Sequence, residues 1–256
     1  SLRQVGTYSC HGVEPSCNDE DGVTAKINQD RGCVVYPFNE DPRHALFSVF
    51  DGHGEHGDVV SHFVMNELQG TLAAHPSLLD DPSKALKESY VKVDEALQKL
   101  KAKEATFSGT TAISVLMRGD NLWISCAGDS RAVLAVSVEG GLKAVDLSED
   151  QNPDTPAEQA RIEAAGGFIS PPPEPGLSSR VWLDAAMTQI GLAMARSIGD
   201  HAVKSIGVIA EPEVTQHTIE EGDEFLLLAS DGVWEFISSQ EAVDIVNSGL
   251  EQGTME

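Results

Sequence analysis

The spacing of apolar residues changes near residue 105, and no other feature of the sequence constrains the fold as strongly. Between residues 56 and 100 apolar side chains recur at helical spacing, which predicts two helices, over 56–74 and 82–100. Strand-like runs joined by short Gly-containing turns then predict an antiparallel meander over residues 110–117, 121–127, 131–138 and 142–147. Two further buried strands are expected at 45–50 and 225–230. Paired helices and antiparallel strands without regular alternation favour an α+β fold with sheets packed under helices.

Two motifs resemble capping boxes, in which a Ser or Thr and a Glu three residues later satisfy the backbone at a helix start. Residues 155–158 (Thr-Pro-Ala-Glu) predict a helix that ends at Gly166, and residues 238–241 (Ser-Ser-Gln-Glu) predict one that ends near Gly249. Residues 170–190 contain a Pro-rich stretch and are expected to form an irregular, flap-like excursion. Such long loops in compact domains commonly carry function.

Length and charge limit the classes of protein. A chain of 256 residues without a visible linker predicts a single domain over 1–256. The net charge of −24 excludes a nucleic-acid or anionic-membrane partner, and no apolar run approaches the roughly 18 residues of a membrane helix. No Cys-x-x-Cys pair occurs, so free thiols are expected rather than a zinc site, at Cys10, Cys17, Cys33 and Cys126. We expect an intracellular monomer in the cytoplasm, with the nucleus as the alternative.

The segment Asp51-Gly52-His53-Gly54 predicts a metal site. It follows an apolar strand and places a carboxylate, a backbone carbonyl and an imidazole close together. Asp231-Gly232 repeats the pattern at the end of another apolar strand, and two neighbouring strand ends can direct two carboxylates at one point. Hard cations such as Mg²⁺ and Mn²⁺ take oxygen ligands of this kind. A single Asp-Gly taken alone is more typical of a plain turn, but further turn-borne acids at Asp30 and Asp129 strengthen the metal interpretation.

Six motifs occur in the order found in the metal-dependent protein serine/threonine phosphatases of type 2C, the PPM family, which this chain resembles from about residue 25 to 248. They lie at residues 28–30, 49–54, 108–112, 128–131, 195–200 and 229–235. One such motif is weak, but six in order are specific. The resemblance implies two antiparallel sheets packed as a sandwich with helix pairs outside, a four-layer αββα arrangement. It also implies a binuclear Mg²⁺ or Mn²⁺ site and direct hydrolysis of phosphoserine and phosphothreonine in protein substrates by a metal-bridging hydroxide.

Site roles follow from the resemblance, residue by residue. Asp51 resembles the carboxylate that bridges both metals, and the Gly52 carbonyl resembles a ligand of the second metal. Asp231 resembles a ligand of the first metal, Asp30 the acid that holds metal-bound water, and His53 the proposed general acid. Two more positions, together with Asp231, match those associated with a weaker third cation. These two positions are Asp129 and Glu235.

The chain also departs from the family pattern. Gln29 stands where the family often has an acid, and Ala25 stands where many members have a phosphate-binding Arg. The adjacent Lys26 is a candidate phosphate contact, but a lysine lacks the bidentate fork of an arginine and a surface role is an equal alternative. Arg131 and Arg196 are interpreted as structural ion-pair partners. The expected C-terminal helix and strands, with an Asp-Asn pair that supplies a further metal ligand, are not found before Glu256.

Two functions are therefore open. The first is a metal-dependent protein serine/threonine phosphatase, a phosphoric monoester hydrolase, whose flap shapes substrate access. The second is a catalytically silent, phosphatase-like binding module. Retention of Asp51, His53, Asp129 and Asp231 favours the enzyme, whereas the missing terminal aspartate favours the binding module for this chain.

Overall fold

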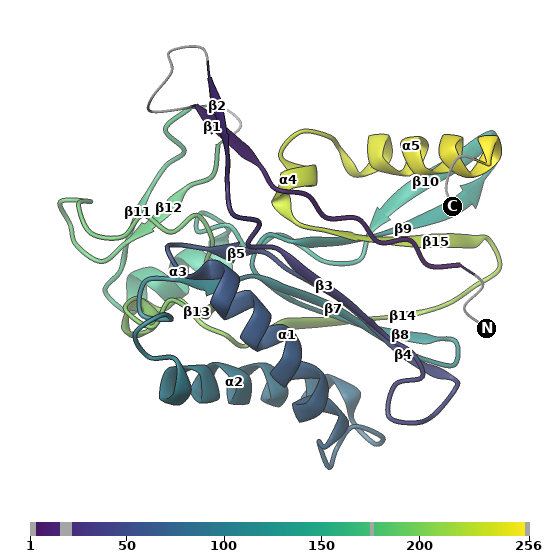
Figure 1. Ribbon diagram of the computed structural model, residues 1–256, viewed down its shortest axis with the longest axis horizontal. Coiled ribbons are helices and arrows are strands. Elements are labelled where there is room, and N and C mark those ends of the chain that lie inside the picture. The colour runs from purple at the N-terminus through teal and green to yellow at the C-terminus, as the bar shows by residue number, and fades with distance from the viewer. Residues whose placement is uncertain (1–3, 16–21, 175–176, 254–256) are drawn as a thin grey trace.

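The structure is a computed structural model of the 256-residue chain, and it describes residues 4–15, 22–174 and 177–253. Two antiparallel sheets lie face to face in it (Figure 1). The larger has the strand order β14 (Glu213–Thr218), β8 (Asn121–Ala127), β7 (Ala112–Arg118), β4 (His44–Phe50) and β3 (Arg31–Val35). The smaller has the order β10 (Gly141–Asp146), β9 (Arg131–Val138) and β15 (Asp223–Ala229).

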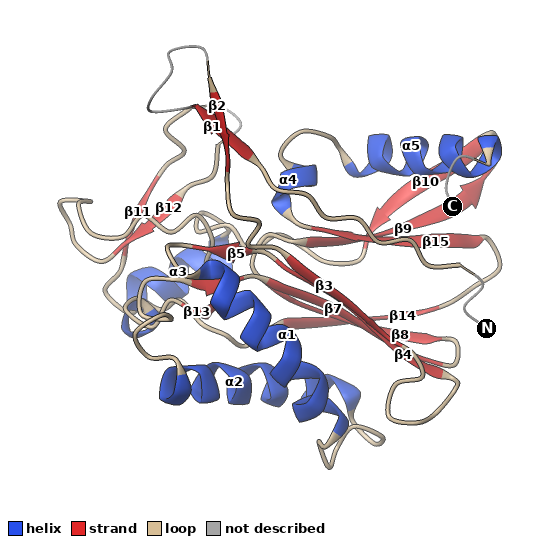
Figure 2. Cartoon of the chain, viewed as in Figure 1, coloured by secondary structure: helices blue, strands red, loops and turns tan. Residues whose placement is uncertain are grey.

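Helices cover the two outer faces of the sandwich, as Figure 2 shows. Helices α1 (Gly57–Ala73) and α2 (Pro82–Leu100) pack on the larger sheet, and α5 (Ser239–Gln252) packs on β10 of the smaller one, with the one-turn α4 (Asp231–Trp234) at the end of β15. The α+β sandwich expected from the sequence is confirmed. Helices α1 and α2 and most strands lie within one or two residues of their predicted bounds.

Apolar side chains fill each space between the layers. Phe50, Val64 and Tyr90 belong to the cluster between α1, α2 and the larger sheet, and the Tyr90 hydroxyl lies 3.0 Å from the Oγ atoms of Ser114 and Ser125. A second cluster lies between the two sheets, and a third, which includes Val243, lies under α5. These clusters fix the ends of β4 and β15 relative to one another, which is where the candidate site lies.

The predicted four-strand meander is wrong at its second turn. Strands β7 and β8 pair in the larger sheet, but β9 and β10 belong to the smaller one, so residues 128–130 cross from one sheet to the other. Gly128 makes this crossing with a φ of +118°, and a Cβ there would lie 2.7 Å from the Thr111 side chain. A short Gly turn does not tell whether the next strand pairs with the last one, and the crossing places Asp129 between the sheets.

One capping box forms and the other does not. The Ser238 side chain accepts from the Glu241 amide, and the Glu241 side chain accepts from the Ser238 amide, as predicted, although α5 continues past Gly249 to Gln252 and ends at Gly253 (φ +62°). Helix α3 (Pro156–Ala164) begins where expected, but Thr155 makes no capping hydrogen bond. Its partner Glu158 is buried against arginines, and these stronger bonds hold it away from the helix start.

Smaller strand pairs complete the described chain. Residues Phe168–Ser170 (β11) and Arg180–Trp182 (β12) form a hairpin, and a bridge joins Val181 to Leu192, so the predicted excursion at 170–190 is partly regular. Residues 175 and 176 within it lie outside the described part. A three-stranded group consists of β13 (Ile198–Gly199), β6 (Gly109–Thr110) and β5 (Gly52–His53). Listed in chain order, the remaining elements are β1 (Val13–Pro15), β2 (Val23–Ala25) and the 3-10 helix η1 (Lys204–Ile206).

None of the helices in the described residues combines the length and the apolar character that a membrane span requires. Cys10, Cys33 and Cys126 are free thiols, and Cys17 lies outside the described residues. Burial raises the pKa of both Cys33 and Cys126 above that of an ordinary thiol.

Candidate active site

The turn after β4 is built so that only glycine fits at residue 52. A Cβ there would collide with the carbonyl oxygens of Gly57 and Gln29. The Asp51 carbonyl accepts from the Thr111 amide at 2.9 Å, and the Asp51 amide donates to the Thr111 hydroxyl at 3.0 Å. These bonds fix the Asp51 backbone at the end of a strand whose core residues are buried, and the carboxylate therefore starts from a rigid base.

Asp231 reaches the same region from the other sheet. It follows β15 and opens α4, and it raises the pKa of Asp51 both by its charge and through a side-chain hydrogen bond. The preceding Ser230 hydroxyl donates to Asp30 Oδ2 at 3.0 Å, and the Asp30 amide donates to Asn28 at 3.0 Å. The ends of β4 and β15 and the segment before β3 therefore bring together three acids that are up to 201 positions apart in the sequence.

The electrostatics of this carboxylate cluster, defined as Asp30, Asp51, Asp129 and Asp231, are unfavourable for the protein alone. Burial first, and then the charges of Asp30 and Asp231, raise the pKa of Asp51 to about 10. Burial and the charge of Asp231 likewise raise the pKa of Asp129 to about 7. Burial and Asp231 also raise the pKa of Glu235, whereas the charge of Arg180 acts in the opposite direction.

A divalent cation fits this cluster in charge and in donor chemistry. Asp129 is only 6% exposed, and its Oδ1 has no hydrogen-bond partner among the described residues. Within the same residues no Lys or Arg forms an ion pair with Asp51, Asp129 or Asp231. No three Asp, Glu, His or Cys side chains of residues 4–15, 22–174 and 177–253 already surround one point as ligands. The acids lie near one another without three of them meeting at one point, and oxygen ligands of this kind are those that hard cations take.

His53 lies beside this cluster and is held by an acid that the sequence did not single out. Its Nε2 atom lies 2.7 Å from Asp200 Oδ2. Burial lowers the pKa of the imidazole, but the charge of Asp200 and its hydrogen bond outweigh burial, so the pKa is raised. Asp200 lies in the motif at residues 195–200, which the resemblance included without a role. Only the folded chain shows a contact across 147 residues.

Two further candidates lie apart from the cluster. Gln29, at the position where an acid was expected, donates from Nε2 to the Gly54 carbonyl at 2.8 Å and thus supports the turn. Lys26 is exposed next to Gly12, with its amide donating to the Gly12 carbonyl at 2.9 Å, and its ammonium forms no ion pair with any described residue. A phosphate contact by Lys26 stays a prediction.

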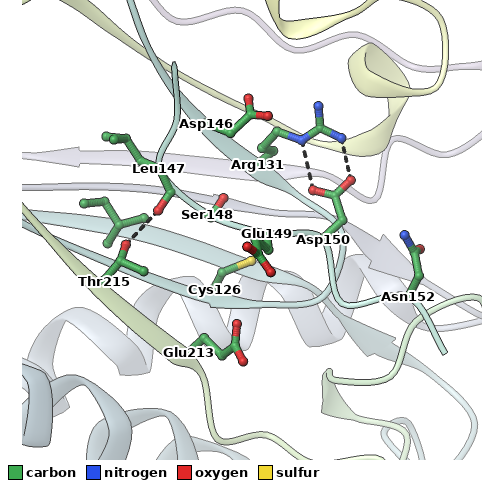
Figure 3. Close-up of a pocket in the computed structure, with 11 residues that line it drawn as sticks. Cys126, Arg131, Asp146, Leu147, Ser148, Glu149, Asp150, Asn152, Glu213 and Thr215 are labelled. Carbon is green, nitrogen blue, oxygen red and sulfur yellow. Dashed lines mark hydrogen bonds and ion pairs between the residues drawn. The ribbon is translucent and has the colours of Figure 1, made fainter. Parts of the chain in front are cut away.

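Two pockets adjoin near the cluster. One of about 300 Å³ lies between the acids Asp129, Asp231 and Glu235 and the flap residues Pro172, Leu177 and Ser179. Figure 3 shows the larger one, of about 700 Å³, where Arg131 binds Asp150 through bonds of 2.9 and 2.6 Å. Its arginine and aspartate neutralise each other, which confirms the structural interpretation of Arg131. The smaller pocket lies against the cluster and is the better candidate for substrate.

Comparisons with known proteins identify the family of this chain. The protein phosphatase 2C family matches residues 5–256. A probable protein phosphatase 2C 35 of Arabidopsis thaliana is 38% identical over 239 residues, which cover 86% of this chain and 68% of that protein. A probable protein phosphatase 2C 64 of Oryza sativa subsp. japonica is 41% identical over 233 residues, covering 87% of this chain and 54% of that protein.

A solved structure supports the fold. The serine-threonine phosphatase 2C from Toxoplasma gondii has a TM-score of 0.78 and 22% identity, over 88% of this chain and 80% of its own. The chain belongs to the protein phosphatase 2C family. It is thus a serine/threonine protein phosphatase, and the resemblance found in the sequence is confirmed.

Proposed function

We propose that the chain hydrolyses phosphoserine and phosphothreonine in proteins with the help of two Mg²⁺ or Mn²⁺ ions bound at the carboxylate cluster, and a weaker third ion nearby. The observation that carries this proposal is the gathering of Asp51, Asp129 and Asp231 without an ion-pair partner among the described Lys and Arg residues. Like charges that are partly withdrawn from solvent, as these are, are costly unless a cation joins them.

Each acid has a separate place in the proposed site. Asp51, the Gly52 carbonyl and Asp231 would hold the two ions. Asp129 and Glu235, with Asp231, would hold the weaker third ion. When bound, such ions lower the pKa of a water toward neutrality and orient the phosphate for in-line attack.

Side chains of the protein orient the water, protonate the leaving group and shape access to the site. Asp30, whose Oδ2 accepts from the Ser230 hydroxyl, would hold and orient the attacking water. His53 donates a proton to the leaving serine or threonine oxygen as the P–O bond breaks, a step worth about 10²–10⁴ in rate. The flap residues Pro172 and Leu177 border the pocket and shape access for a protein segment. We place the reaction inside the cell, in line with the free thiols.

The decisive experiment measures phosphate release from a phosphothreonine peptide as Mn²⁺ or Mg²⁺ is titrated into chelator-treated protein. We expect activity to appear with the cation and Asp231→Asn to need much more of it. Asp244→Asn is the matched control, because Asp244 is an exposed acid on α5 whose Oδ1 bonds Gln240. If the folded protein released no phosphate at millimolar Mn²⁺ yet bound a phosphopeptide, the silent binding module would be the better description.

A further inference from the structure

The contact between His53 and Asp200 depends on the strand order β13, β6, β5. In this group Gly109 of β6 pairs with His53 on one side and with Gly199 on the other. A Cβ at Gly109 would collide with Asp200 Oδ2 and lie 2.8 Å from His53 Nε2. The missing side chain at residue 109 therefore leaves the space in which the imidazole and the carboxylate meet, across an intervening strand.

Asp200 is itself held firmly. It is 4% exposed and adopts a left-handed backbone with a φ of 50°, with its amide donating to the Ser108 carbonyl at 2.9 Å. Burial raises the pKa of its carboxyl, but His53, Ser197 and the charge of Lys204 lower it by more, so it is held below the usual range. The carboxylate thus keeps its charge in the interior.

A second acid, on α2, balances Lys204 and holds the loop that carries Asp200. Asp94 Oδ1 lies 3.6 Å from Lys204 Nζ, accepts from the Gly199 amide at 2.7 Å and lies 3.2 Å from His201 Nε2. The pair of His53 and Asp200 is therefore connected to the helix layer through charged contacts, and a chance surface contact would have no such support.

We infer that Asp200 is the positioning residue for His53: it holds Nε2 and leaves Nδ1 as the nitrogen that serves the substrate. The Nδ1 atom is buried and has no hydrogen-bond partner among the described residues. This inference rests on the proposed role of His53. As the P–O bond breaks, its electron pair goes to the leaving serine or threonine oxygen, which takes the Nδ1 proton. The imidazolium thereby becomes a neutral imidazole, whose Nε2–H still donates to Asp200. A proton from solvent then restores the charged form.

The chain offers a matched control for a test by mutation. His217 Nε2 lies 2.7 Å from Asp223 Oδ2, and the side chains of this pair are 27% and 7% exposed, against 23% and 6% for His53 and Asp200. The control pair joins β14 to the start of β15, away from the carboxylate cluster. Asp223→Asn therefore reports what losing a buried His–Asp contact does to the fold alone.

We expect Asp200→Asn to lower kcat on a phosphothreonine peptide by about 10²-fold or more, and to lower it much less on p-nitrophenyl phosphate, whose leaving group needs little protonation. His53→Ala should show the same split, and the double variant should be no slower than His53→Ala, because the two residues act as one unit. Asp223→Asn should show no split.

The outcomes separate the two ideas. If His53→Ala itself loses rate equally on both substrates, the proposed general acid is wrong. If His53→Ala shows the split and Asp200→Asn does not, the proposed function stands and the positioning role is overturned. Should Asp200→Asn fail to fold, ¹⁵N NMR of His53 in the unaltered protein decides: a neutral tautomer protonated at Nε2 supports the inference, and one protonated at Nδ1 overturns it.

Discussion

Two buried acidic regions of this molecule have similar surroundings but opposite electrostatics. In the carboxylate cluster, Asp51 and Asp129 have raised pKa values because burial and like charges act together. At α3, Glu158 is 2% exposed, yet its pKa is lowered: burial would raise it, but hydrogen bonds from Arg196 and Arg161 outweigh burial. Arg196 Nη2 lies 2.6 Å from Glu158 Oε1, and Arg161 Nη2 lies 2.6 Å from Oε2.

The difference separates a site whose negative charge is balanced by side chains of the protein from one that needs cations from solution. Glu158 carries its own cations within the chain and serves the structure. The carboxylate cluster has no such partners among the described residues, which suits a place where ions from solution bind. Four tests, in decreasing order of their expected effect, examine this contrast.

Replacing one carboxylate of the cluster by an amide should abolish activity but raise the stability of the metal-free protein. We expect Asp51→Asn to lower kcat by about 10³-fold or more, because metal assistance is worth several kcal/mol and each tenfold corresponds to about 1.4 kcal/mol. In chelator, the same variant should be more stable than the unaltered chain, since the folded state no longer has to hold a proton on a carboxyl that ionises in the unfolded chain. Phosphate release and urea denaturation measure the two effects. A variant that is inactive and also less stable in chelator would contradict the contrast.

Removing Glu158 should have the opposite effect on stability, because its main consequence is a lower free energy of unfolding. We expect Glu158→Ala to lower the free energy of unfolding by about 3–5 kcal/mol, because it removes the buried partner of Arg196 and leaves it only the exposed Glu213. Glu163→Ala on the same helix is the matched control, since Glu163 is exposed and its side chain accepts from Gln159. Urea denaturation in chelator measures both variants. If both variants lowered the free energy of unfolding equally, Glu158 would contribute no more to stability than an exposed acid on the same helix.

Divalent cations should stabilise the protein through the cluster alone. At a concentration of about 100 times Kd, a bound ion adds roughly 2.7 kcal/mol, which for a domain of this size is a rise in Tm of about 5–10 °C. We expect Mn²⁺ to raise the Tm of the Glu158→Ala variant by as much as that of the unaltered chain, and to raise that of Asp51→Asn much less. A similar rise in all three proteins would place the ions elsewhere.

The sequence predicted local structure well but predicted contacts between residues distant in the sequence poorly. Helix α2 has the bounds that its apolar spacing predicts, because burial of one face produces that spacing. The crossing at Asp129 and the contact between His53 and Asp200 could not be predicted, since each depends on which strands become neighbours. Glu158 was misread for the same reason: a capping-box position was visible, but the arginine from residue 196 was not.

The smallest test uses pH, because the two regions should respond with opposite sign. In the unfolded chain Asp51 and Asp129 release their protons near a pKa of 3.8, whereas in the folded chain they keep them up to about 10 and about 7. Between about pH 4 and 7 the metal-free folded state therefore binds more protons than the unfolded state, and stability must fall as pH rises. The slope is at most about 1.4 kcal/mol per pH unit for each proton.

Glu158 contributes in the reverse sense, because its lowered pKa stabilises the fold above its unfolded value of 4.5 and this contribution is lost as pH falls. Urea denaturation in chelator from about pH 5 to 8 therefore separates the contribution of the cluster from that of Glu158, and comparison with Asp51→Asn separates it from that of the histidines. We expect a falling stability that Asp51→Asn makes shallower and Glu158→Gln leaves in place. Saturating Mn²⁺ should flatten the slope, since ion binding releases the retained protons and the folded state then binds no more protons on these carboxyls than the unfolded state. Suppose instead that the free energy of unfolding in chelator did not change with pH, and that Asp51→Asn left this unchanged. These carboxylates would then not hold their protons, and like charges would not raise their pKa values.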